Sequence, residues 1–125
     1  MNESDYSSKL LKELRTKHNC FTFKVAGGYY QRSGMPDSLI IDEGRYYWIE
    51  FKGPNTPVTP LQQQTIKNLR EHGAMVYVVR FVDHRTWSID DRWNVLFDES
   101  FAEGVMTLLR WLREQPYHQK NIVIG

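Results

Sequence analysis

Residues 36–52 read PDSLIIDEGRYYWIEFK, and this stretch decides the fold. Leu39–Asp42 and Tyr46–Lys52 are apolar and aromatic runs of strand length, rich in residues that favour β structure. Glu43–Arg45 separates them, which is the signal of a β-hairpin. Two antiparallel strands are therefore expected near the middle of the chain, with Asp37 at the start of the first.

The residues before this hairpin predict a helix and a further strand. Asp5–His18 carries apolar side chains at helical spacing, namely Tyr6, Leu10, Leu11 and Leu14. Cys20–Val25 reads CFTFKV, which alternates and favours β structure, so a strand is expected there. Two glycines end this strand, and Gly27–Pro36 is expected to form a polar loop.

The residues after the hairpin predict a loop and then a capped helix. Gly53–Pro60 contains three prolines and must be a loop. Thr59 is a good N-cap, Pro60 suits the first helical position, and Gln62 completes a capping box. The helix is expected to end near Gly73.

The remaining segments predict an α/β fold in one domain spanning 1–125. Met75–Phe81 is a continuous apolar run typical of a buried strand, and Phe101–Arg113 is an amphipathic helix. For His84–Asp98, a hairpin and a capping excursion are both open. The expected order is therefore α-β-β-β-α-β-α, and a helix that links two strands of one sheet favours a mixed sheet flanked by helices.

Composition indicates an ordinary globular domain. The 125 residues are 41% hydrophobic and 25% charged, with a net charge of +1, which argues against a disordered chain. The single cysteine, Cys20, excludes an intramolecular disulfide framework and a cysteine-based zinc cluster, and it favours a reducing intracellular compartment. No apolar run approaches the roughly 18 residues of a membrane span, and the first residues lack the core of a secretory signal.

Charge is unevenly distributed along this nearly neutral chain. Lys9–Arg32 holds six bases and one acid, a net charge of +5. Asp83–Glu103 holds six acids and two bases, a net charge of −4. Either these are two solvated faces, or the basic segment meets a polyanion.

Chemically useful residues gather at the open end of the hairpin. Glu50 and Lys52 are two residues apart on one strand and therefore share a face. Hairpin pairing places Asp37 beside Glu50. Two carboxylates offer hard oxygen ligands to magnesium or manganese, and the lysine can orient a water or hold a phosphate. The alternative is that Glu-x-Lys is a solvent-facing strand pair and Pro-Asp a simple turn.

Two helices place further polar residues toward this end. If the first helix extends back to Glu3, helical spacing puts Glu3 in the middle of the apolar stripe, where a carboxylate needs a cation. The alternative is a frayed terminal residue favoured by the helix dipole. On the second helix, Gln62 lies within the stripe of Leu61, Ile66 and Leu69 and should face the sheet, although its capping role alone would explain it.

Five motifs follow one another along the chain: Gly34–Asp37, Glu50–Pro54, Thr59–Gln62, Gly73-Ala74 and Val78–Arg80. In this order and spacing they resemble the VRR-NUC family of the PD-(D/E)XK nuclease superfamily, which includes small stand-alone phage and bacterial members. The match covers a core of residues 3–81, and the C-terminal helix and tail span 99–125. Asp83–Asp98 and Asn121–Gly125 match no part of the family. The resemblance implies a restriction-endonuclease-like fold and a magnesium-dependent endonuclease acting on DNA, with manganese as a substitute. Stand-alone members resemble homodimers, and some resemble Holliday junction resolvases, so branched DNA is an expected substrate.

The resemblance also implies roles for individual residues. Asp37, Glu50 and the carbonyl of Phe51 would bind metal, and Lys52 would position the attacking water. Glu3 would be an auxiliary acid, binding metal through water, and Gln62 would support the site. The strand lysine of the family resembles Lys24. Together with the basic segment, this predicts DNA contacts from Arg15, Lys17, Lys24, Tyr29, Tyr30 and Arg32.

Two other functions are open for this chain, and its function as a nuclease would favour a particular assembly. The chain would otherwise be a catalytically silent nucleic-acid-binding module of the same fold, or a protein–protein adaptor that binds through its acidic half or its tail. Paired cuts need two sites, which favours a twofold homodimer. The expected interface is either the aromatic stretch Trp87–Phe97 or the strand-like Ile122–Ile124, which would otherwise pack on its own domain.

Overall fold

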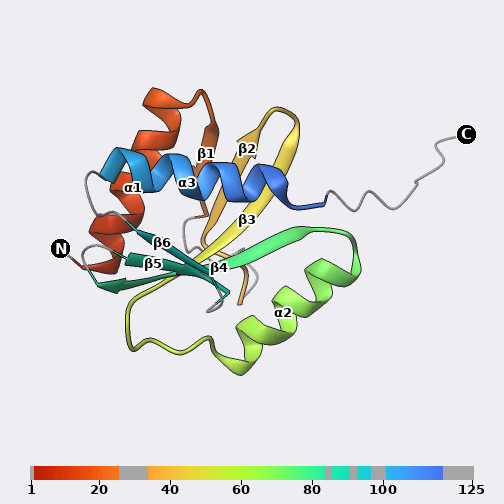
Figure 1. Cartoon of the computed structure of the whole chain (residues 1–125). Coiled ribbons are helices and arrows are strands. Elements are labelled where there is room, and N and C mark those ends of the chain that lie inside the picture. Colours follow the sequence, from red (N-terminus) through yellow and green to blue (C-terminus); the bar gives the residue numbers. More distant parts are fainter. Residues whose placement is uncertain (1, 26–33, 84–85, 91–92, 97–100, 117–125) are drawn as a thin grey trace, which may run out of the picture.

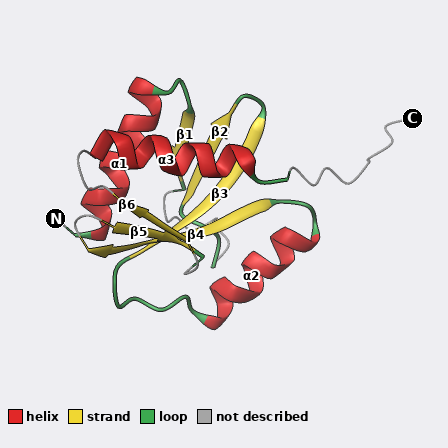
Figure 2. Cartoon of the chain, in the orientation of Figure 1, coloured by secondary structure: helices red, strands yellow, loops and turns green. Residues whose placement is uncertain are grey.

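The structure is a computed structural model that describes residues 2–25, 34–83, 86–90, 93–96 and 101–116. These residues form one six-stranded sheet and three helices, coloured by type in Figure 2. The elements in chain order are α1 (Glu3–Lys17), β1 (Phe21–Lys24), β2 (Ser38–Asp42), β3 (Arg45–Lys52), α2 (Pro60–Glu71), β4 (Met75–Asp83), β5 (Thr86–Ile89), β6 (Trp93–Leu96) and α3 (Phe101–Glu114).

The sheet is mixed, as expected, with the strands in the order β1-β2-β3-β4-β5-β6. Neighbouring strands are antiparallel except β3 and β4, which are parallel and joined through α2. The predicted α/β class is confirmed, and β5 and β6 add two strands to the predicted order. Of the two alternatives for His84–Asp98, the described residues form the hairpin.

The β2–β3 turn explains the register of the hairpin. Asp42 pairs with Arg45, so Glu43 and Gly44 form a two-residue turn. Both turn residues have positive φ, 50° and 81°, as a type I′ turn requires, and a glycine adopts the second without strain. This turn sets Ser38 opposite Ile49 at the far end of the strands.

Helices cover the two faces of the sheet unequally (Figure 1). Helices α1 and α3 lie together on one face, where their predicted stripes are buried against β3 and β4; this main core includes Leu10, Leu14, Leu108, Leu112, Tyr47, Ile49 and Val79. Helix α2 lies on the opposite face, where Ile66 packs with Val76 and Val78 of β4 and with Trp48 of β3. None of the helices among the described residues has both the length and the apolar composition of a membrane span.

Two expectations about apolar side chains are wrong. Leu61 does not join the buried stripe of α2 and is 53% exposed, because Thr65 and Ile66 occupy the side that meets the sheet. Trp87 is not available to a dimer interface, because it is fully buried and its ring contacts the rings of Tyr6 and Phe51. Residues 122–124, the other expected interface, lie outside the described residues.

Candidate active site

Asp37 and Glu50 lie at the open end of the β2–β3 hairpin, opposite its turn. Ser38 pairs with Ile49, and the same register places Asp37, one residue before β2, opposite Glu50. The Asp37 carboxylate is fixed on both sides. Its Oδ2 accepts a hydrogen bond from the Phe51 backbone N–H at 3.2 Å, and its Oδ1 accepts one from the Ser38 hydroxyl at 2.9 Å.

Lys52 completes the group on the same face of β3. Its side chain is buried, and Nζ lies 3.7 Å from Oε1 of Glu50. Phe51 points to the other face and packs in the main core, which agrees with the expected alternation. An ammonium and two carboxylates are therefore held by a rigid strand pair.

Gln62 reaches these residues from α2, where it both closes the capping box of the helix and contacts Glu50. Its Oε1 accepts a hydrogen bond from the Thr59 N–H at 3.0 Å, which closes the capping box of α2. Its Nε2 donates to Oε1 of Glu50 at 3.2 Å. The cap thus fixes the amide so that its donor end faces the carboxylate.

Glu3 approaches the site from the other face of the sheet. It is the first residue of α1, and Asn2 and Asp5 form a capping box around it, so it is not a frayed residue. Its Cβ lies beside Gly53, the residue that follows Lys52, at 3.7 Å from where a Gly53 Cβ would stand. The N-x-x-D sequence of this capping box is a signal that the helix prediction from Asp5 missed.

The carboxylates of Asp37 and Glu50 have too little positive charge around them. The pKa of Glu50 is raised from 4.5 to about 7, first by burial and then by the charge of Asp37, while Lys52 opposes the rise. Burial also raises the pKa of Asp37, against the hydrogen bonds from Ser38 and Phe51. Glu3 raises the pKa of both groups. A bound cation would relieve this repulsion.

The donor set fits a hard divalent cation. Asp37 and Glu50 supply carboxylate oxygens, and the carbonyl of Phe51 lies between Glu50 and Lys52 in the chain. Among the described residues, no three His, Cys, Asp or Glu side chains gather closely enough to hold a metal ion by themselves. Two carboxylates and a backbone carbonyl are the kind of ligands that hard divalent cations such as magnesium take, with water completing the coordination.

The expected DNA contacts are divided between described and undescribed residues. Arg15, Lys17 and Lys24 are exposed on α1 and β1. Arg15 donates to the Thr22 hydroxyl at 2.8 Å, and Lys24 donates to the Ser8 hydroxyl at 3.3 Å. The charge of Lys24 also lowers the pKa of Asp37, so Lys24 is within electrostatic reach of the site. Tyr29, Tyr30 and Arg32 lie outside the described residues.

Arg80 and Ser38 contact residues of the candidate site, although the sequence assigned no role to either. Arg80 pairs with Lys52 across β3 and β4 and donates to the carbonyls of Gly53 and Thr56, which anchors the loop after Lys52. Ser38 positions Asp37. Their positions in the sequence could have indicated these contacts, because Ser38 directly follows Asp37 and Arg80 ends the Val78–Arg80 motif.

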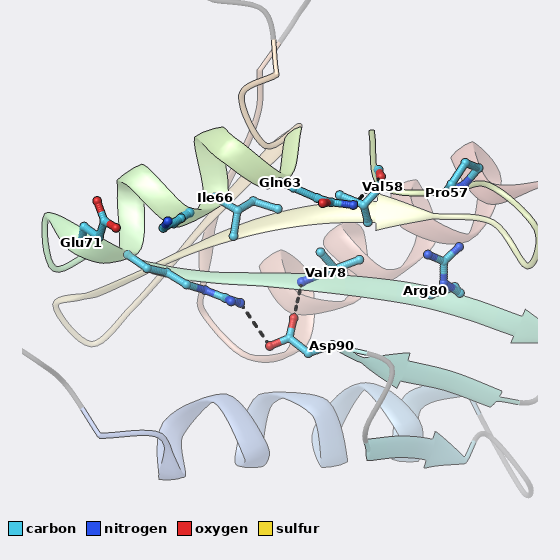
Figure 3. Close-up of a pocket in the computed structure, with 10 residues that line it drawn as sticks. Pro57, Val58, Gln63, Ile66, Glu71, Val78, Arg80 and Asp90 are labelled. Carbon is cyan, nitrogen blue, oxygen red and sulfur yellow. Dashed lines mark hydrogen bonds and ion pairs between the residues drawn. The ribbon is translucent and has the colours of Figure 1, made fainter. Parts of the chain in front are cut away.

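A groove of about 870 Å³ lies between α2 and β4, where Ile66, Val78 and Arg80 are among the residues that line it (Figure 3). Several of its polar side chains bond to other protein groups. Arg70 donates to the Val76 carbonyl and pairs with Asp90, and Asp90 accepts from the Val78 N–H. These bonds give Arg70 and Asp90 a structural role. We therefore assign the groove no part in the chemistry.

Comparisons with known proteins identify the family and the fold of the chain. The VRR-NUC domain family matches residues 2–83. A solved VRR-NUC domain is 27% identical, with a TM-score of 0.54 over 64% of this chain and 85% of that chain. The Holliday junction resolvase Hjc of the archaeal hyperthermophile Archaeoglobus fulgidus is 24% identical, with a TM-score of 0.52 over 69% of this chain and 74% of that chain. These likenesses confirm the predicted nuclease fold. No curated protein matches the chain.

Proposed function

This chain belongs to the VRR-NUC family, a family of nucleases, and from that premise we propose that it is a magnesium-dependent endonuclease. It hydrolyses phosphodiester bonds of DNA and prefers branched structures such as four-way junctions. Manganese substitutes for magnesium. The substrate preference is supported by the fold that the chain shares with a Holliday junction resolvase.

The observation that carries the proposal is the group of Asp37, Glu50 and Lys52 at the open end of the hairpin. The carboxylate and ammonium groups of β3 are both buried and only 3.7 Å apart. Burial and the charges of neighbouring acids raise the pKa values of Glu50 and Asp37. A structural ion pair would have matched its charges, so this arrangement favours a cation-binding catalytic site.

Each residue has a distinct task in the proposed reaction. Asp37, Glu50 and the Phe51 carbonyl hold the cation, which when bound polarises the phosphodiester and stabilises the leaving oxygen. Lys52 orients the attacking water through its ammonium group. Gln62 holds the Glu50 carboxylate in place by the hydrogen bond from Nε2, and Glu3 adds a further acid at the edge of the site.

The proposal extends to DNA contacts and assembly. Exposed Arg15, Lys17 and Lys24 contact phosphates, and we extend this role to Tyr29, Tyr30 and Arg32. The chain carries one set of ligands, so a twofold homodimer supplies the second site that paired cuts require. The free Cys20 is consistent with a reducing intracellular compartment, the cytoplasm of a bacterial or phage-infected cell.

A cleavage assay tests the proposal directly. Plasmid, single-stranded and four-way junction DNA are incubated with the protein in magnesium, manganese, calcium or EDTA. Cleavage is expected with magnesium and manganese only, because the larger, looser coordination of calcium replaces the octahedral geometry of magnesium poorly. Glu50→Ala should be inactive, and Glu114→Ala, which removes an exposed carboxylate of α3, should cleave normally.

The same assay separates the competing functions. A catalytically silent module would bind DNA yet cut none of the three substrates with any metal. An adaptor protein would neither bind nor cut. Cleavage that persists in purified Glu50→Ala would show that the chemistry lies elsewhere.

A further inference from the structure

The loop before Asp37 lies against the start of helix α2. Gly34 in this loop has a φ of +84°, a conformation that favours glycine. A Cβ at this position would stand 2.9 Å from Cγ of Leu61, 3.0 Å from Oγ1 of Thr65 and 3.1 Å from the carbonyl oxygen of Leu61. Carbon atoms pack at about 3.5–4.0 Å, so the loop lies this close to α2 only because residue 34 has no side chain.

The same turn of α2 also contacts the strand that carries Glu50. Gln62 follows Leu61 in the helix and donates from Nε2 to Oε1 of Glu50 at 3.2 Å. The capping box of Thr59 and Gln62 fixes this turn in place. One rigid turn therefore supports both the loop that leads to Asp37 and the side chain of Glu50.

A short segment connects the contact at Gly34 with the Asp37 carboxylate. Met35 lines a hollow together with residues of α2, and Pro36 has a fixed φ, so the segment has little conformational freedom. At its far end, the Asp37 carbonyl accepts a hydrogen bond from the Val25 N–H at 2.7 Å. If the loop moved away from α2, Asp37 would turn about this bond and its carboxylate would change position.

We propose that Gly34 is a positioning residue of the candidate active site, because its missing side chain lets α2 set where the Asp37 carboxylate stands relative to Glu50. The inference rests on the proposed function, in which these two carboxylates bind the cation. Gly34 fixes the spacing of the ligands without being one of them. Changes to groups that orient metal ligands typically cost about 10- to 100-fold in metal affinity.

Gly44, in the turn of the β2–β3 hairpin, provides a matched control. Its φ is +81°, and a Cβ there would meet no atom of the described residues within 4 Å. Gly34→Ala and Gly44→Ala therefore introduce a similar backbone strain, and only Gly34→Ala pushes a loop away from α2. A difference between the two variants reports the contact with α2 rather than the conformational preference of glycine.

The first measurement needs neither metal nor DNA. The Phe51 amide reports the position of Asp37, because it donates to Oδ2 of that carboxylate at 3.2 Å. In NMR spectra recorded in EDTA, the Phe51 amide proton should move upfield in Gly34→Ala and stay in place in Gly44→Ala. If Gly34→Ala does not fold, Gly34→Asn gives the same reading with less strain, because asparagine adopts positive φ more readily. An unmoved Phe51 resonance in a folded Gly34 variant would overturn the proposal, whether or not the chain is a nuclease.

Calorimetry gives a second reading. The magnesium dissociation constant should rise about 10- to 100-fold in Gly34→Ala and keep its wild-type value in Gly44→Ala. Adding Leu61→Ala to Gly34→Ala removes the nearest contact and should recover part of this loss. Equal affinities in the two glycine variants, or a double variant that recovers nothing, would also overturn the proposal. A wild type that binds no magnesium would contradict the proposed function instead, and the Phe51 resonance would still decide the role of Gly34.

Discussion

The two ends of the β2–β3 hairpin both bury a carboxylate, and they treat it in opposite ways. Asp42, beside the turn, is 2% exposed and receives two hydrogen bonds from the guanidinium of Arg113, at 2.8 and 2.9 Å. These bonds lower the pKa of Asp42. Glu50, at the open end, is 6% exposed, and its pKa rises to about 7.

The difference lies in the partners rather than in burial. Arg113 meets Asp42 with the two parallel N–H groups that match a carboxylate, so charge and geometry are both satisfied. Glu50 has Asp37 on one side and a single ammonium at 3.7 Å on the other. A buried acid with a matched cation stabilises the fold, whereas a buried acid next to another acid destabilises the chain until a ligand compensates it.

Making the same small change at both ends gives the largest expected effect. Glu50→Gln should reduce cleavage at least about 1,000-fold, because a metal ligand worth several kcal/mol in the transition state is lost. Its urea unfolding midpoint should stay level or rise. Asp42→Asn should do the reverse, with a lower midpoint and unchanged cleavage per folded molecule. Cleavage by Glu50→Gln within tenfold of the wild-type rate would contradict the contrast.

Lys52→Ala should give the next largest effect. Losing the group that orients the water should slow cleavage by about 10²- to 10⁴-fold. Magnesium binding, followed by calorimetry, should persist because the oxygen ligands remain. Lys67→Ala, which removes an exposed ammonium from α2, serves as the control and should cleave normally. Loss of metal binding in Lys52→Ala would mean that the lysine organises the ligands instead.

The pH dependence of stability should also separate the two ends. Folded Glu50 keeps its proton where the unfolded chain has lost it, so stability in EDTA should fall as pH rises from 4.5 to about 7. The loss should be roughly 2–3 kcal/mol. Urea unfolding at pH 5 and pH 8 measures it, and Glu50→Gln should remove this part of the dependence. An identical pH dependence in both proteins would argue against a raised pKa.

Arg113→Ala should give the smallest effect of the four. The Arg113 side chain is 43% exposed, so solvent screening limits the loss of unfolding free energy at neutral pH to about 1–2 kcal/mol. Asp42 has a lowered pKa, so this stabilisation should be present above pH 3.8 and disappear as pH falls through the lower folded value. Arg110→Ala, an exposed neighbour on α3, should leave unfolding unchanged at every pH. Equal losses in both variants would show that the ion pair stabilises nothing.

The sequence predicted those parts of the molecule that local spacing determines. The stripes of α1 and α3 follow from helical period, and the meeting of Asp37 with Glu50 follows from a short turn and strand register. Gln62 was placed correctly because its capping box fixes its position on α2. Their roles in catalysis remain predictions.

Contacts between distant segments were beyond reach of the sequence. Asp42 and Arg113 are 71 residues apart, and no local pattern links them. Trp87 was expected at a surface because aromatic composition alone does not say which side of a strand meets the core. The exposure of Phe21, Phe23 and Tyr46 was missed for a related reason. Alternation predicts a strand, but only the position of α2 decides which side chains on that side of the sheet are covered.

The double role of Gln62 restricts which amino acid this position can hold. A capping box accepts Glu or Gln at its third helical position, and both present an oxygen to the Thr59 N–H. Glutamate would keep the helix start but turn a second oxygen, with its negative charge, toward Glu50. Alanine would bring no such repulsion, but it would lose the hydrogen bonds to the Thr59 N–H and to Glu50. Exchange of one nitrogen for one oxygen thus separates a residue that merely starts a helix from one that also steadies a carboxylate.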